Sequence, residues 1–245
     1  MSDAMYIAAT GALNYQKKLD VLANNIANIN TVGFKEDQVS FVSSDLSVDN
    51  MTDDTSPSTE LLSIVVKPVF SSGDMRFTGN KFDLALEGDG FFSVNSPDGV
   101  RYTRNGSFTF NNDGILVTHD GFPVLGDGGE IKIDNSDDQN IVIDESGNIY
   151  SGDKKIGTLK LVDFPKPYNL VKLENTSFMV EDTNVSEINP VDLKVNQGFI
   201  ELSNVNAVKA MTDMIETLRG YESYQKVIKS LEDISSKAIN DVGSV

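Results

Sequence analysis

Apolar residues recur at steps of three and four at both ends of the chain, whereas shorter steps prevail between them. The N-terminal series is Met5, Ala8, Ala12, Tyr15, Leu19, Leu22, Ile26 and Ile29. The C-terminal series is Val208, Met211, Ile215, Leu218, Tyr221, Tyr224, Ile228 and Leu231. This spacing predicts two helices, each with a narrow apolar stripe that packs against another helix. Stripes so far apart need partners, either each other or the same segments of neighbouring copies, so the pattern favours an assembly protein.

The first helix is predicted over residues 3–29, because Asn28 to Gly33 supply a helix stop and a turn. Its polar side is rich in Asn, at positions 24, 25, 28 and 30. Either this is ordinary helix-end composition, or the amides satisfy polar groups across a contact between subunits. The second helix begins within residues 203–206 and runs to about Asn240. Gly220 inside it marks a close approach of two helices or a bend.

The region from about Leu61 to Val180 changes to a period of two, as in Phe82 to Leu86, and turn sequences divide its short runs. Examples of these turns are Ser96-Pro97-Asp98-Gly99, Asn111-Asn112-Asp113-Gly114 and Asp120-Gly121. Phe110–Ile115 and Ile143–Ile149 are weakly similar in sequence, and repeated hairpins explain this similarity. The predicted fold class is α+β, with the terminal helices pairing as a coiled-coil-like stem and a central, mainly antiparallel β-rich domain.

The expected organisation has four parts. They are an N-terminal assembly helix at 1–36, a flexible polar linker at 37–60, a β-rich domain at 61–196 and a C-terminal assembly helix at 197–245. The linker assignment rests on residues 43–60, which hold five acidic residues and no basic one. Such a segment buries too little apolar surface to order itself alone.

The formal charge of −17 is concentrated in the middle of the chain. Residues 1–36 have a net charge of 0 and residues 197–245 of −2, which leaves −15 for the remainder. This balance argues against nucleic acid and anionic membranes as partners. It also lets the helical ends crowd together without strong repulsion. The chain has no cysteine, no signal-peptide pattern at its start and no apolar run of the ~18 residues that a membrane span needs, so disulfides, conventional export and membrane spanning are not expected.

Chemical motifs are sparse. His119 is the single histidine, in a predicted turn, and has no usual metal co-ligand. Gly88-Asp89-Gly90 lacks the third glycine and the following helix of a dinucleotide site. The Asp144 loop lacks the glycine and the bidentate acid of a calcium site. The aromatic residues of the middle region are expected in its core: Phe91, Phe92, Tyr102, Phe108 and Phe110. We therefore predict no catalytic, cofactor, metal or small-molecule site, although two acids of a carbohydrate-active enzyme could be hidden among the many carboxylates.

Three sets of segments resemble the flagellar rod, hook and hook-associated axial proteins. The N-terminal set is Ala9–Ala12, Leu19–Asn28 and Thr31–Lys35; the central set is Gly88–Phe92 and Tyr102–Phe108; the C-terminal set is Gln197–Asn206 and Arg219–Glu222. Their order and spacing match over nearly the whole chain. Gly121–Gly126, followed by Gly129-Glu130-Ile131, is similar to the proximal-rod branch.

The resemblance implies a structural, non-enzymatic subunit of the proximal rod, the driveshaft that crosses the periplasm. It implies terminal helices that line an inner tube, export through the flagellar type III apparatus without a cleaved signal, and contacts with other rod proteins and copies of itself. The polymer contact is expected at Leu19, Leu22, Ile26, Met211, Ile215 and Leu218. The alternative for these residues is a helical hairpin within one monomer. Alternatives for the whole protein are a distal-rod or hook subunit and, from another class, a periplasmic carbohydrate-active enzyme.

Overall fold

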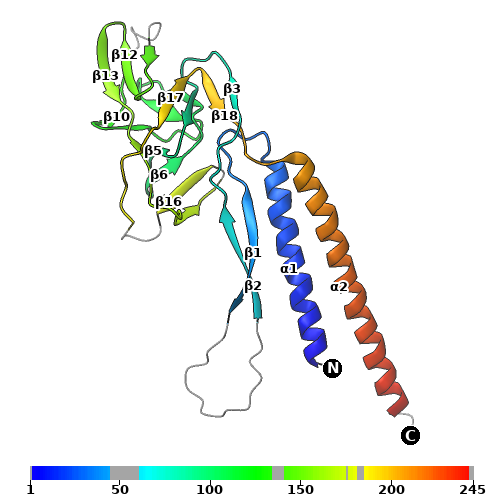
Figure 1. Ribbon diagram of the computed structural model, residues 1–245. Coiled ribbons are helices and arrows are strands. Elements are labelled where there is room, and N and C mark those ends of the chain that lie inside the picture. Colours follow the sequence, from blue (N-terminus) through cyan, green and yellow to red (C-terminus); the bar gives the residue numbers. More distant parts are fainter. Residues whose placement is uncertain (1, 45–60, 134–140, 175, 181–184, 243–245) are drawn as a thin grey trace, which may run out of the picture. The chain divides into compact units, whose positions relative to one another are not determined.

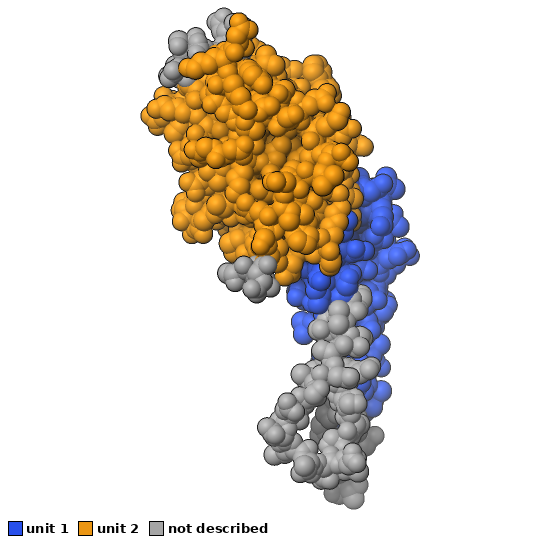
Figure 2. All heavy atoms as spheres, turned by 60° about the vertical axis from the view of Figure 1, so that its left-hand side comes forward, with its two compact units in different colours: residues 1–27, 37–69, 205–245 blue, residues 28–36, 70–204 orange. Residues whose placement is uncertain are grey.

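The computed structural model describes residues 2–44, 61–133, 141–174, 176–180 and 185–242, and it divides into two compact units. Unit 1 holds residues 1–27, 37–69 and 205–245, and unit 2 holds residues 28–36 and 70–204 (Figure 2). The predicted α+β class with a mainly antiparallel β-rich middle is confirmed. The boundaries differ from the expected ones, since residues 28–36 and 197–204 belong with the β-rich unit and residues 61–69 with the helices.

Unit 1 consists of two long helices and a two-stranded hairpin (Figure 1). Its elements are α1 (Ser2–Ala27), β1 (Asp37–Ser44), β2 (Leu61–Pro68) and α2 (Ala207–Val242). The helices lie side by side and antiparallel. α1 ends two residues before the predicted limit, where the Thr31 amide donates to the Asn28 carbonyl (3.0 Å). α2 begins directly after the predicted start region 203–206, and the Asn206 side chain caps it by accepting a hydrogen bond from the Lys209 amide (3.1 Å).

The first residues of the expected linker form a strand, so that prediction is wrong over 37–44. β1 pairs with β2 in antiparallel register from Asp37↔Pro68 to Ser44↔Leu61. The side chain of Asn25, which is fully buried in α1, exchanges two hydrogen bonds of 2.9 Å with the backbone of Asp37. This pair of bonds fixes the start of β1 against α1. It also shows that the Asn25 amide is satisfied within the chain. The acid-rich segment 45–60 lies outside the described residues.

Unit 2 is built from short antiparallel strands. They are β3 (Met75–Phe77), β4 (Leu84–Glu87), β5 (Phe91–Ser96), β6 (Gly99–Thr103), β7 (Phe108–Phe110), β8 (Leu116–Thr118), β9 (Leu125–Gly126), β10 (Gly129–Glu130), β11 (Ile141–Ile143), β12 (Asn148–Ser151), β13 (Lys154–Thr158), β14 (Leu161–Val162), β15 (Leu170–Lys172), β16 (Ser177–Val180), β17 (Lys194–Gln197) and β18 (Phe199–Glu201). Among the described residues the largest sheet has the order β14-β5-β6-β16-β15, and a three-stranded sheet has the order β11-β12-β13.

Two apolar clusters form the core of unit 2. One contains Phe92 and Phe108, and the other contains Phe91 and Tyr102, so these four predicted core aromatics are confirmed. Phe110 is half-buried at the edge of the first cluster. The alternation predicted around β4 is not reflected in burial, because Leu84, Ala85 and Leu86 are all fully buried. β4 is therefore covered on both faces, and an alternating sequence pattern does not detect that arrangement.

The two turns of unit 2 that are similar in sequence share one hydrogen-bond arrangement. The Asn111 side chain accepts hydrogen bonds from the amides two and four residues later, each of 2.9 Å. The Asp144 carboxylate accepts from the equivalent amides of Ser146 and Asn148, at 2.9 and 2.8 Å. Each turn closes on a glycine with positive φ, Gly114 or Gly147. Asp144 thus serves the turn with its side chain.

Candidate assembly interface

The contact between α1 and α2 is built from small residues. Ala8 and Ala12 of α1 and Ala210 and Thr217 of α2 are each at most 5% exposed. Small side chains let two helix backbones approach closely. The C-terminal stripe predicted from large apolar residues therefore only partly describes the face of α2 that meets α1.

Two Gly–Tyr contacts set the closest approach of these helices. A Cβ atom on Gly11 would lie 2.4 Å from the ring of Tyr224, and one on Gly220 would lie 2.2 Å from the ring of Tyr15. The two tyrosine rings contact each other, with centroids 5.4 Å apart. Each helix thus supplies one tyrosine and one glycine. Of the two explanations for Gly220, close helix approach is the one that the structure supports.

The six predicted interface residues do not lie on a single surface of the described chain. Leu22 is buried, and Leu19 and Ile26 are half-buried. Met211, Ile215 and Leu218 are 53%, 55% and 45% exposed. A hairpin within one chain therefore accounts for the α1 half of the predicted set. It leaves the α2 half in solvent.

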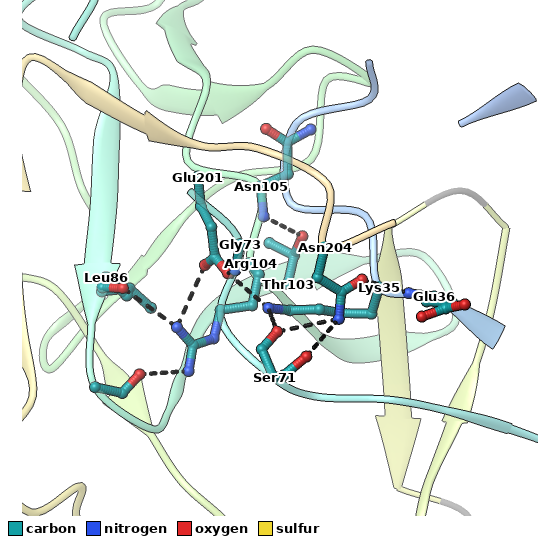
Figure 3. Close-up of polar contacts among 11 residues, drawn as sticks. Lys35, Glu36, Ser71, Gly73, Leu86, Thr103, Arg104, Asn105, Glu201 and Asn204 are labelled. Carbon is teal, nitrogen blue, oxygen red and sulfur yellow. Dashed lines mark hydrogen bonds and ion pairs between the residues drawn. The ribbon is translucent and has the colours of Figure 1, made fainter. Parts of the chain in front are cut away.

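A cluster of buried charges lies in unit 2 (Figure 3). Lys35 Nζ lies 2.6 Å from Glu201 Oε1, and Arg104 Nη1 lies 3.4 Å from Glu201 Oε2. All three side chains are 3% exposed or less. Ser71 and Gly73 complete the surroundings, since Lys35 donates to the Ser71 carbonyl (2.8 Å) and the Gly73 amide donates to Glu201 (2.9 Å). Removing these charges from water is costly, and the cluster is tolerated because Lys35 and Arg104 both pair with Glu201.

Two cations share one carboxylate in this cluster, which leaves one positive charge without an anion. Backbone carbonyl dipoles must therefore stabilise that charge. The Arg104 guanidinium donates to the carbonyls of Gly88 (2.6 Å) and Leu86 (3.3 Å) and lies over the ring of Phe91. Burial lowers the pKa of Lys35, and the neighbouring Glu201 carboxylate opposes that shift. The arrangement stabilises structure.

The same cluster joins the chain that follows α1 to the chain that precedes α2. The Gly33 amide donates to the Glu201 carbonyl (2.8 Å), and the Glu36 amide donates to the Asn204 side chain (2.7 Å). Gly33 has φ of +70°, and a Cβ atom there would lie 2.3 Å from the backbone nitrogen of Asn105. Only glycine fits this position. Unit 2 is therefore completed by a segment that is distant in sequence from the rest of it.

Four segments singled out by resemblance meet at this cluster. They are Thr31–Lys35, Gly88–Phe92, Tyr102–Phe108 and Gln197–Asn206. Sequence reasoning quoted these motifs but did not identify Lys35, Arg104 and Glu201 as one ionic group. The available signal was the presence of a single charge in each of three motifs that otherwise consist mainly of uncharged residues.

The other candidate residues do not come together as a chemical site in the part of the chain that the structure describes. His119 is exposed in a turn. Within the described part of the chain, no group of three or more histidine or acidic side chains is placed to hold a metal ion. Neither described helix combines the length and apolar character required to cross a membrane.

Comparison with known proteins gives three family matches along the chain. The models are the flagella basal body rod protein over residues 5–35, the flagellar hook protein FlgE/F/G D1 domain over residues 85–151, and the flagellar basal body rod FlgEFG protein C-terminal over residues 196–241. They coincide with the three sets of motifs identified in the sequence.

Full-length relatives carry related names. The flagellar basal-body rod protein FlgF of Caulobacter vibrioides is 34% identical, with 100% of both chains covered. FlgF of Mesorhizobium japonicum is 31% identical over 100% of this chain and 99% of the relative. The flagellar basal-body rod protein FlgG of Bacillus subtilis is 32% identical over 98% of this chain and 99% of the relative.

Proposed function

This chain belongs to the family of flagellar basal-body rod proteins, and from that premise we propose that it is a proximal-rod subunit of the FlgF type that assembles through its terminal helices. The family is structural and not enzymatic. The observation that carries the finer assignment is the end-to-end similarity to FlgF of Caulobacter vibrioides, with 34% identity. The similarity of residues 121–131 to the proximal-rod branch supports the same assignment.

The proposed mechanism is completion of the fold on assembly. α1 and α2 pair as a coiled-coil-like stem, and neighbouring subunits cover the apolar surface that this pair leaves exposed. Met211, Ile215 and Leu218 are the α2 contribution, and Leu19, Leu22 and Ile26 support it by holding α1 in place. A helix with one narrow apolar stripe is marginal in water. Burial of the exposed stripe by a neighbour supplies the missing stabilisation.

The proposed location is the part of the rod that crosses the periplasm, reached through the flagellar export apparatus without a cleaved signal peptide. Charge supports this arrangement. Unit 2 has 12 basic and 23 acidic side chains, whereas residues 1–36 are neutral. An acidic unit is well solvated, and near-neutral helices can pack closely with copies of themselves and with other rod proteins.

A second candidate is a distal-rod subunit, because a FlgG relative is 32% identical over nearly the full length. Position along the rod separates the two candidates, and a hook subunit would lie further out still. The test uses basal bodies isolated from a strain that carries the tagged chain and lacks its FlgG-type protein. We expect the tagged chain to remain in these truncated basal bodies. Its loss would indicate a distal position, and its absence from complete basal bodies would contradict the rod function itself.

A further inference from the structure

The last residues of unit 2 in sequence pair with its first strands. Residues 194–204 contain β17 and β18, and we call them the C-terminal segment of unit 2. β17 pairs with β4 and β18 pairs with β3, both in antiparallel register (Figure 1). Neither pair can form until nearly all of unit 2 has been synthesised, because β3 and β4 come early in the unit and β17 and β18 come at its end.

The C-terminal segment also fills part of the core. Val195 and Ile200 are 2% and 4% exposed, and Val195 belongs to the same apolar cluster as Leu84 and Phe92. The Val195 amide donates to the carbonyl of Glu145 (2.9 Å), which ties the segment to the turn between β11 and β12. Without the segment, this cluster would lose a packed side chain and expose its neighbours to water.

Charge makes the dependence on the C-terminal segment stronger. Glu201, at the end of β18, is the carboxylate that pairs with both Lys35 and Arg104. If the rest of unit 2 closed without the segment, these two cations would be buried without that anion. Such a state is strongly unfavourable, so the rest of the unit gains little from closing alone.

The same segment secures the other end of unit 2. Residues 28–36 reach the unit from α1, and the Gly33 amide donates to the Glu201 carbonyl (2.8 Å). The Asn204 amide donates to the carbonyl of Phe34 (3.4 Å), whose side chain is 1% exposed. The first and last parts of unit 2 therefore hold each other in place.

We propose that unit 2 folds stably only with its C-terminal segment in place, so that this segment sets the moment at which the unit can fold. The net stability of a domain is small compared with the sum of its contacts, and the segment supplies strand pairing, core packing and the central anion together. Synthesis proceeds from the N-terminus, so unit 2 stays open until residues 1–193 have been made and the segment follows.

The inference has a consequence for export, and this consequence rests on the proposed rod function. A subunit that leaves a narrow channel with its N-terminus first would keep unit 2 extended until the C-terminal segment has also left. Unit 2 would then close in a single step, directly before α2 emerges. A partly exported chain would present no folded unit at the channel exit.

Native-state hydrogen exchange of the full chain tests the inference. It measures whether the rest of unit 2 stays closed when the C-terminal segment detaches. The Leu202 amide, which donates to the Asp74 carbonyl (2.8 Å), reports on the segment. The Val124 amide, which donates to the Leu116 carbonyl (2.8 Å) inside the first apolar cluster, reports on the core. We expect the two amides to open together, with protection factors that agree within about threefold.

A pair of variants in the segment makes the test sharper. Ile200→Ala removes a buried side chain, so it should lower the protection factors of the Leu202 and Val124 amides by the same factor, at least about tenfold. Lys194→Ala is the matched control at an exposed position of the segment and should leave both protection factors unchanged. If Ile200→Ala does not fold, Ile200→Val takes its place with a smaller drop, again equal at the two amides.

Two outcomes would overturn the inference. Exchange at Leu202 that is much faster than at Val124 would show that the core stays closed while the segment is detached. A drop in protection that Ile200→Ala confines to the segment would show the same. These measurements use the purified chain and do not depend on the rod. Absence of the protein from basal bodies would therefore contradict the proposed function and the consequence for export, but not the folding of unit 2.

Discussion

A buried carboxylate that serves two cations is harder to replace than a surface one. Glu201 pairs with Lys35 and Arg104 at positions shielded from water, so its loss would leave two positive charges without their anion. The surface pair Lys194–Glu145 has a similar distance of 3.0 Å, but its side chains are 56% and 70% exposed. Solvent screens that pair, and its contribution to stability is small.

We predict that Glu201→Gln lowers the free energy of unfolding by about 3–5 kcal/mol, the usual cost of breaking a buried ion pair. Urea unfolding followed by tyrosine fluorescence measures the change, because the chain has no tryptophan. Glu145→Gln is the control and should leave the urea midpoint within error of the natural chain. Equal effects of the two substitutions would show that the cluster contributes no more than a surface pair.

The backbone conformation of Gly33 leads to a second prediction at the residue scale. Gly33→Ala places a Cβ atom against the backbone of Asn105 and forces alanine to φ of +70°. We expect a loss of at least about 2 kcal/mol in the free energy of unfolding, since backbone cannot move aside as a flexible side chain can. Gly128→Ala, with nothing within 4 Å of the added atom, should be close to neutral in the same urea titration.

At the scale of elements, the sequence patterns predicted the features that depend on neighbouring residues alone. The two helices, the cap at Asn206 and the turns at Gly114 and Gly147 follow from spacing and turn residues. The strand at 37–44 did not, because its pairing with β2 and its bond to Asn25 come from outside the segment. The ionic cluster joins Lys35 to a residue 166 positions away, so the local pattern singles out the charges but does not show which of them pair.

The face of α2 that meets α1 was also beyond the sequence pattern, for a different reason. A search for large apolar residues selects Met211 and Ile215, whereas Thr217 is buried and Gly220 makes the close contact with α1. Large apolar residues indicate that a helix surface is apolar. They do not indicate whether the other helix of the same chain or a neighbouring subunit covers that surface. The predicted set of interface residues was therefore divided between the inside of the helix pair and its exposed side.

The Gly–Tyr contacts predict that the effect of Gly220→Ala on stability changes sign when Tyr15 is replaced by alanine. In the natural chain Gly220→Ala must displace the Tyr15 ring, so we expect it to destabilise unit 1 in spite of alanine's higher helix propensity. In a Tyr15→Ala background the space is free, and the same substitution should stabilise α2 by about 1 kcal/mol. Thermal unfolding followed by circular dichroism at 222 nm measures both effects. Ser236→Ala, at an exposed position of α2, should act equally in the two backgrounds; the same behaviour from Gly220→Ala would refute the proposed contact.

At the scale of the whole molecule, the distribution of charge and the exposed apolar surface both bear on how a free subunit becomes part of an assembly. A subunit must stay soluble before assembly and associate during it. The acidic excess of unit 2 supports solubility, and the near-neutral helices keep association free of strong repulsion. The apolar area whose burial drives association is then supplied by the exposed residues Val208, Met211, Ile215 and Leu218, which we call the α2 stripe.

Two substitutions to aspartate separate folding of the subunit from its assembly. Leu22 is only 7% exposed in α1, so Leu22→Asp should reduce the helical circular dichroism of the purified chain while unit 2 stays folded. Ile215 is 55% exposed, so Ile215→Asp should leave helicity and the unfolding midpoint within error of the natural chain. Both variants should abolish incorporation into basal bodies and motility, but for different reasons. Ser223→Asp adds the same charge to an exposed position of α2 outside the stripe and should preserve motility. Normal motility with Ile215→Asp would mean that the α2 stripe is not a polymer contact, because a charge buried there without a partner would cost several kcal/mol at every subunit interface.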